Sequence, residues 1–161
     1  MKNDSHLKIA MIGHKRIPSR EGGVEIVVYE LSSFLAKAGN RVDVYNRGGS
    51  HVSGSRFKSA DMPLDPNVKI ITVPTPKSKT LNAFVYSFFA SLRALFGGYD
   101  VIHFHAEGPA AMCFLPKLFG IRTVATIHGL DWQRSKWGDF ASKYLKFGEK
   151  TAAKYADEII V

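Results

Sequence analysis

Three histidines lie at or near the ends of apolar runs that predict β-strands, where side chains can meet a ligand. His103 and His105 are two residues apart in DVIHFH, so in a strand they share one face. His128 ends a second such run, TVATIH, directly before a glycine. The three side chains could hold a metal ion, as in a metal-dependent hydrolase, but no carboxylate set completes the group. Polar packing or substrate contact is the favoured interpretation, and the metal site stays as an alternative.

Two adjacent glycines, Gly22 and Gly23, directly precede a predicted amphipathic helix in the stretch REGGVEIVVYELSSFLAKAGN. Glycines let the backbone approach a ligand, and a helix N-terminus offers free N–H groups and a partial positive charge. The pattern favours a bound anion, although a loop that needs glycines in order to turn would look the same. The spacing from Gly13 to Gly22 is too wide for the GxGxxG fingerprint of dinucleotide binding, and the chain contains no P-loop GKS or GKT.

Apolar runs alternate with helical periodicities along the chain, which predicts an α/β fold with a parallel, doubly wound sheet of Rossmann-like topology. The predicted strands cover residues 7–13, 41–46, 67–73, 99–105, 122–128 and 157–161. The predicted helices cover about 24–38, 80–96, 109–119 and 138–155. The segment between the second and third strands is rich in glycine, serine and charge, which predicts a long mobile loop over 47–66.

The helix predicted at 80–96 carries large apolar residues on one stripe, which predicts that this stripe packs into the core rather than against a membrane. The stripe consists of Leu81, Phe84, Val85, Phe88, Leu92 and Leu95. This apolar window is too short to span a bilayer, and the N-terminal residues do not form a signal peptide. We therefore expect a soluble protein, or at most a peripheral one.

The predicted strands position the unusual residues at one edge of the sheet. In an open α/β sheet, ligands bind beyond the carboxyl ends of the strands. Four loops meet there: 14–23, RGGS at 47–50, AEGP at 106–109, and 129–137, which contains Trp132 and Trp137. The two tryptophans could stack on a sugar or a base, or anchor their loop. This edge is the candidate site.

The charge of the chain favours anionic partners. The 161 residues, about the size of one domain, include 22 Lys and Arg against 14 Asp and Glu, which gives a formal net charge of +8. Nucleic acid, phosphorylated ligands and the acidic face of a membrane are the partners that such a balance attracts. Cys113 is the single cysteine, which excludes an internal disulfide and suits a reducing cytosol.

The order and spacing of these segments resemble the N-terminal domain of family-4 retaining glycosyltransferases of the GT-B fold. The segments that carry the resemblance are the first strand, the loop ending in GGVE, the following helix, DVIHFH, TVATIHG and ADEIIV. The resemblance spans essentially the whole chain. The opening from Met11 to Arg47 looks especially like bacterial enzymes that add sugars to lipid-linked surface polysaccharides.

The resemblance implies roles for particular residues. Gly22 and Gly23 match the family's glycine loop, which reaches the phosphates of the nucleotide-sugar donor, and His128 matches the histidine beside the donor sugar at the reaction centre. Other side chains at the edge are expected to contact the acceptor or the sugar: Arg16, Arg20, His105, Glu107 and Asp131. The family needs no metal and no cofactor beyond the nucleotide-sugar. The resemblance further implies an enzyme that is cytoplasmic or peripheral on the inner face of the plasma membrane. It would act on a glycan or lipid-linked acceptor and not on nucleic acid.

The chain stops inside its last predicted strand, at Val161. We therefore expect residues 1–161 to be an N-terminal, acceptor-side domain whose C-terminal nucleotide-sugar-binding domain is absent, so that this piece alone turns nothing over. A non-catalytic module that binds anionic ligands is the remaining alternative, besides the metal-dependent hydrolase.

Overall fold

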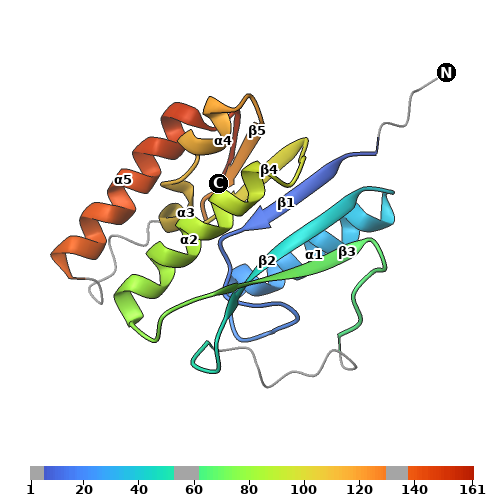
Figure 1. Ribbon diagram of the computed structural model, residues 1–161, viewed down its shortest axis with the longest axis horizontal. Helices are drawn as coiled ribbons and strands as arrows, with labels where there is room; N and C mark the ends of the chain where they lie inside the picture. The colour runs from blue at the N-terminus through green and yellow to red at the C-terminus, as the bar shows by residue number, and fades with distance from the viewer. Residues whose placement is uncertain (1–5, 53–61, 130–137) are drawn as a thin grey trace.

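A computed structural model describes residues 6–52, 62–129 and 138–161 (Figure 1). Its centre is one parallel sheet of six strands in the order β3-β2-β1-β4-β5-β6. The strands are β1 (Lys8–Ile12), β2 (Arg41–Gly48), β3 (Val68–Pro74), β4 (Val101–His105), β5 (Arg122–Thr126) and β6 (Glu158–Ile160). The helices are α1 (Gly23–Lys37), α2 (Lys79–Leu95), α3 (Glu107–Ala110), α4 (Phe114–Leu118) and α5 (Asp139–Tyr155). This order is the doubly wound Rossmann arrangement, so the predicted fold class is confirmed.

Helices cover both faces of the sheet. In Figure 1, α2 to α5 lie in front of the strands and α1 lies behind them. Each side has its own core, because the side chains of a strand alternate between the two faces. Ile102 and Phe104 of β4 belong to the core beneath α2 and α5, whereas Met11 of β1 packs with Val28 of α1. The alternation therefore places His103 and His105 on the face that α1 covers.

The prediction of one helix over 109–119 is wrong. The segment forms two short helices, α3 and α4, separated by a turn at 111–113. Pro116 explains the break, because it has no N–H to donate to the carbonyl of residue 112. The predicted loop at 47–66 begins later than expected, since β2 continues to Gly48, and residues 53–61 lie outside the described part of the chain.

The predicted packing of α2 is also wrong. Leu81, Phe84, Phe88 and Leu92, expected in the core, are 38–53% exposed. The buried side of the helix instead carries small or polar residues and one tyrosine: Asn82, Tyr86, Ser87, Ala90, Ser91 and Ala94. Small side chains let the helix approach the sheet closely, whereas the period alone cannot say which face of a helix points inward. Among the described helices, none is long and apolar enough to cross a bilayer.

Candidate functional site

The sheet has a topological switch point between β1 and β4. The strands β2 and β3 follow on one side of β1, and the strands β4, β5 and β6 follow on the other. Ligands bind at this place in open α/β sheets, beyond the carboxyl ends of the strands. Gly13 follows β1 there with φ of +139°, and an added Cβ would lie 2.0 Å from the carbonyl oxygen of His105. Only glycine lets the two strand ends approach this closely.

A row of three histidine rings lies beside the switch point. The rings of His103 and His105 have centroids 4.1 Å apart, and those of His105 and His128 are stacked at 5.6 Å. Nδ1 of His105 is 3.3 Å from Nε2 of His128, and Nε2 of His103 is 2.7 Å from the hydroxyl of Thr126. The structure thus brings His105 and His128 together, as the sequence suggested.

Burial keeps the inner rings of this row neutral. Desolvation, together with the neighbouring His128, lowers the pKa of His103 to about 4, and desolvation with the nearby histidines holds the pKa of His105 well below its usual value. In a hydrogen bond between two imidazoles one nitrogen donates and the other accepts. Nε2 of His105 is buried and has no hydrogen-bond partner among the described residues. His105 therefore orients His128 while one of its own nitrogens is left unused.

The same geometry does not suit a metal ion. Stacked rings direct their nitrogens at one another or at Thr126 rather than toward a common point. Within the ranges that the structure describes, no group of three or more His, Cys, Asp or Glu side chains is arranged to hold a metal. The described geometry thus gives no support to a ligand set built from His103, His105 and His128.

His14, a residue that sequence reasoning did not select, lies directly after the glycine at the switch point. Asn46 Nδ2 donates to the carbonyl of Ile17, so its Oδ1 accepts from Nε2 of His14 at 2.8 Å. Desolvation lowers the pKa of His14 to about 4, which leaves the imidazole neutral with a lone pair on Nδ1. That nitrogen is buried and without a hydrogen-bond partner in the described segments. The available signal was a polar residue immediately after a buried strand.

Arg47 brings a half-buried positive charge to the same edge. Its guanidinium lies 4.9 Å from the ring centroid of Tyr86 and makes only long hydrogen bonds, 3.4 Å each, to Gly13 O and Asn82 Oδ1. It makes no salt bridge with a carboxylate of the described residues, and burial lowers the pKa of the guanidinium. A half-buried cation that has the carboxylate of Glu25 nearby but makes no salt bridge with it favours a site that receives an anion.

Gly22 and Gly23 form the start of α1, as predicted. Gly22 is the N-cap, and no side chain caps the N–H groups of the first turn. Glu25 is buried in that turn, where its Oε1 accepts from the backbone N–H of Lys15 at 2.9 Å and ties the preceding loop to the helix. An added Cβ on Gly23 meets nothing within 4 Å, so this glycine faces open space. At Gly22, in contrast, an added Cβ would lie 2.1 Å from Oε2 of Glu25, so a ligand at this helix start would approach from the side of Gly23.

The remaining predicted contact residues lie in different places. Arg16 donates to the backbone carbonyls of Arg47 and Gly49, so its guanidinium ties the loop after β1 to the end of β2. Glu107 is buried at the start of α3, directly after Ala106, whose φ of +77° is strained for a residue with a Cβ. Asp131, together with Trp132 and Trp137, lies outside the described residues.

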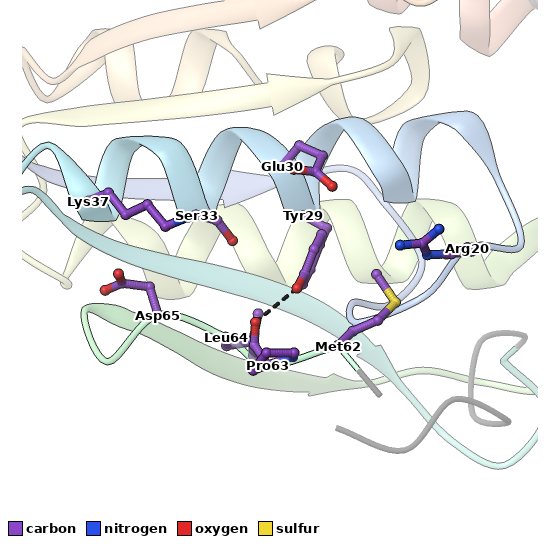
Figure 2. Close-up of a pocket in the computed structure, with 9 residues that line it drawn as sticks. All are labelled: Arg20, Tyr29, Glu30, Ser33, Lys37, Met62, Pro63, Leu64 and Asp65. Carbon is purple, nitrogen blue, oxygen red and sulfur yellow. Dashed lines mark hydrogen bonds between the residues drawn. The ribbon is translucent and has the colours of Figure 1, made fainter. Parts of the chain in front are cut away.

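Arg20 belongs to another hollow. Figure 2 shows a pocket of about 490 Å³ between α1 and the segment 62–65, with Arg20 at one end and Lys37 at the other. The hydroxyl of Tyr29 donates to the carbonyl of Pro63 across it, at 2.8 Å. None of the histidines lines this pocket. The structure therefore does not group Arg20 with the histidine row.

A second pocket does join the histidine row to α1. It has a volume of about 580 Å³ and is lined by Val27, Thr126, Ile127, His128, Gly129, Ile160 and Val161. Val27, one turn beyond Gly23, is the residue through which α1 borders this pocket, and Gly22 and Gly23 are not in its lining. This pocket places a helix N-terminus, suited to phosphate, near a histidine suited to a hydroxyl.

Comparison with known proteins bears on the family and the fold of the chain. The family model described as Glycosyltransferase Family 4 matches residues 21–161. The structure resembles sucrose-phosphate synthase from Thermosynechococcus elongatus with a TM-score of 0.64 and 21% identity, over 97% of this chain and 42% of that one. A UDP-galactose 4-epimerase reaches a TM-score of only 0.44 at 13% identity, covering 75% of this chain and 55% of that chain, which is too low to support an inference. No curated protein matches the sequence.

This chain spans less than half the length of the synthase that it resembles. The likeness to the synthase confirms the fold expected from the sequence, the Rossmann-like sheet found in GT-B glycosyltransferases. The family match covers most of the chain, including the helix start, the histidine row and the last strand. The chain belongs to Glycosyltransferase Family 4.

Proposed function

We propose that this chain is the acceptor-side domain of an enzyme that transfers a sugar, with retention, from a nucleotide-sugar to a glycan or lipid-linked acceptor in surface polysaccharide synthesis. The pocket lined by His128 and by Val27, one turn beyond the start of α1, carries the proposal. Transfer breaks the bond between the anomeric carbon and the phosphate and forms a bond to an acceptor oxygen. A site for this reaction needs donors for the departing diphosphate beside groups that hold the sugar.

The roles follow from the chemistry of each group. The first-turn N–H groups at Gly22 and Gly23 face the diphosphate, where negative charge develops as the bond breaks. His128, oriented by His105, contacts a hydroxyl of the donor sugar, and the neutral rings beneath it form a polar floor. Arg47 supplies the positive charge nearest the switch point, for an anionic group on the donor or the acceptor.

The test supplies the full-length protein with a panel of nucleotide-sugars and lipid-linked or oligosaccharide acceptors. We expect transfer from one donor, with NMR of the product showing the anomeric configuration of the donor preserved. Binding of an anionic ligand without transfer from any donor would instead favour the non-catalytic module. Transfer with inverted configuration would leave a glycosyltransferase but remove retention from the proposal.

Gly23→Ala gives a test of the phosphate contact that leaves the fold intact. A Cβ at this position meets nothing in the protein, and alanine is a better helix former than glycine. If the diphosphate lies against the first turn of α1, the methyl group separates it from N–H donors, and donor affinity falls about tenfold or more. Calorimetric titration of the full-length protein with the donor measures this. Gly138→Ala is the matched control, because a Cβ before α5 also meets nothing, and unchanged donor affinity in Gly23→Ala would place the phosphates elsewhere.

We further propose that no metal ion or cofactor takes part beyond the nucleotide-sugar. The N–H groups of α1 and the cationic Arg47 supply the stabilisation that a bound cation would otherwise give to the leaving diphosphate. Transfer by the full-length enzyme is expected to proceed at the same rate after dialysis against EDTA as before it. A rate that falls with EDTA and returns with Mg²⁺ or Mn²⁺ would overturn this part of the proposal.

The net charge of +8 supports the location that we propose, which is the cytoplasmic side of the plasma membrane. A lipid-linked acceptor is presented at a leaflet whose acidic lipids attract Lys and Arg at about 1 kcal/mol for each residue near the surface. The phosphate groups of the substrates would draw on the same positive charge. Nucleic acid is not part of this proposal.

A further inference from the structure

The helix α2 exposes its most apolar face to solvent, whereas an ordinary surface helix buries that face. Its solvent side carries an apolar face made of Leu81, Phe84, Phe88, Phe89, Leu92 and Phe96, whose side chains are 38–80% exposed. Scattered exposed apolar residues are common, but six on one side of one helix form a contiguous patch. Such a patch on a folded domain indicates a surface that something else covers.

A groove extends this α2 apolar face toward the edge of the sheet. It has a volume of about 500 Å³ and lies between α2 and the edge strand β3, with Val73, Pro74, Phe89, Leu92 and Phe96 in its lining and Arg93 beside them. An apolar hollow with a cation at its border suits an amphiphile whose head is anionic and whose tail is hydrocarbon.

The charged residues in the segments that form and flank the face are mostly basic. Residues 66–99 contain Lys69, Lys77, Lys79 and Arg93 and no acidic residue. Phe84 of α2 contacts Tyr144 of α5, with ring centroids 5.7 Å apart, and Figure 1 shows the two helices on the same side of the sheet. The chain of α5 carries four lysines against two acids, and Lys143, Lys150 and Lys154 are exposed. The face therefore combines an apolar centre with a basic surround.

We infer that the α2 apolar face docks on the surface of a bilayer that contains anionic phospholipids. Phenylalanine and leucine side chains enter the boundary between headgroups and acyl chains, while the lysines of α5 and the basic residues flanking α2 meet phosphate groups. An uncharged protein partner would cover the apolar patch equally well, but it would leave the basic residues beside the patch without anionic partners. The inference rests on the proposed lipid-linked acceptor for its purpose, and it names the surface that holds the enzyme there.

The position of the α2 apolar face suits an enzyme whose acceptor is bound to a membrane. In parallel α/β folds the helices run opposite to the strands, so the first turn of α2 lies at the carboxyl edge of the sheet. Asn82, in that turn, is within hydrogen-bond distance of Arg47. A bilayer lying along α2 would thus border the candidate site and present its lipid headgroups close to the switch point.

Sedimentation of the full-length protein with vesicles tests the inference. Vesicles of phosphatidylcholine alone are compared with vesicles that also contain phosphatidylglycerol, at low and at physiological ionic strength. We expect binding to the anionic vesicles, weakened by salt, and little binding to the neutral ones. Phe89→Ser combined with Phe96→Ser should lower the partition coefficient about tenfold or more, because two exposed aromatic side chains no longer enter the lipid.

A matched control lies on the other face of the sheet. Ile26 and Phe34 of α1 are 41% and 70% exposed, so Ile26→Ser with Phe34→Ser removes a comparable apolar surface away from α2. Equal loss in both double variants, wild-type binding by the α2 variant, or no vesicle binding at low salt would each overturn the inference. Light scattering without vesicles provides a further check: a dimer that dissociates in the α2 variant would assign the face to a second copy of the protein instead.

Transfer to a water-soluble acceptor separates this inference from the proposed function. The α2 variant should retain that transfer, because its substituted side chains lie outside the site. Vesicle binding by a protein that transfers no sugar would refute the proposed function and leave the docking surface standing. Sugar transfer by a protein that does not bind vesicles would refute the docking surface and leave the proposed function standing.

Discussion

His128→Ala in the full-length enzyme is expected to lower kcat by between tens and a thousandfold, while the protein stays folded. A contact made to the reacting sugar only in the transition state is typically worth about 2–4 kcal/mol, which corresponds to this range of rates. His128 is partly exposed, follows β5 and lines the pocket that it shares with α1. Its ring contacts His105 through a hydrogen bond and by stacking, and it belongs to neither hydrophobic core cluster, so truncation removes little of the core.

The kinetic signature separates this role from simple binding. A transition-state contact lowers kcat and kcat/KM together, whereas a contact made equally in the ground state raises KM and leaves kcat unchanged. His6→Ala is the matched control, because His6 is an exposed histidine that precedes β1, at the opposite edge of the sheet. Wild-type turnover in a well-folded His128→Ala protein would remove this residue from the reaction centre.

His105 is expected to act through His128 rather than on the substrate directly. Its ring is fully buried, and Nδ1 faces Nε2 of His128. His105→Phe keeps a flat ring but removes this nitrogen, so kcat should fall by less than in His128→Ala. His105→Asn, whose side-chain amide can offer a hydrogen bond in place of Nδ1, should recover part of the rate. If the double variant His105→Phe/His128→Ala is no slower than His128→Ala alone, the two residues act as one unit.

The six strands and the Rossmann-like parallel sheet could be predicted from the sequence, because each buried parallel strand is a short apolar run bounded by glycine, proline or polar residues. The carboxyl edge of the sheet followed from that prediction, and His105, His128 and the start of α1 were placed there before any contact was known. Arg20 shows the limit of this reasoning. It belongs to a loop at that edge, yet its guanidinium lines a separate pocket against the segment 62–65.

Tertiary packing decided what the sequence could not. The apolar stripe of α2 has the period of a core helix, but the sheet accepts the opposite side of the helix, where Ala90 and Ala94 allow close approach. His14 and Asn46 are far apart in the chain, and only the parallel pairing of β1 with β2 brings them within 2.8 Å. A pattern of residue types records periodicity but does not record which distant segment completes a hydrogen bond.

Acidification from pH 7 to pH 4 is expected to remove a large part of the stability of this domain. The pKa of His14 and that of His103 are each lowered to about 4, chiefly by burial, whereas an unfolded histidine titrates near 6.5. Between those two values the unfolded chain binds protons that the native state excludes, so the free energy of unfolding falls as the pH falls. The loss begins near pH 6.5 and ends near pH 4, below which both states are protonated at these rings.

The size of the effect follows from the two pKa values. Each of these histidines is worth on the order of 3 kcal/mol over that range. A domain of ordinary stability has about 5–15 kcal/mol in total. Urea unfolding of the full-length protein at pH 7, 6 and 5 measures how the free energy of unfolding depends on pH. A spectroscopic probe within residues 1–161 reports the unfolding of this domain. His103→Gln should lower the slope of the free energy of unfolding against pH at pH 5 by the amount that corresponds to about one proton taken up on unfolding. His6→Gln, at an exposed histidine, is the control. A free energy of unfolding that stays constant from pH 7 to pH 5 would mean that these rings are not buried in the neutral form, and the polar floor proposed beneath His128 would then be wrong.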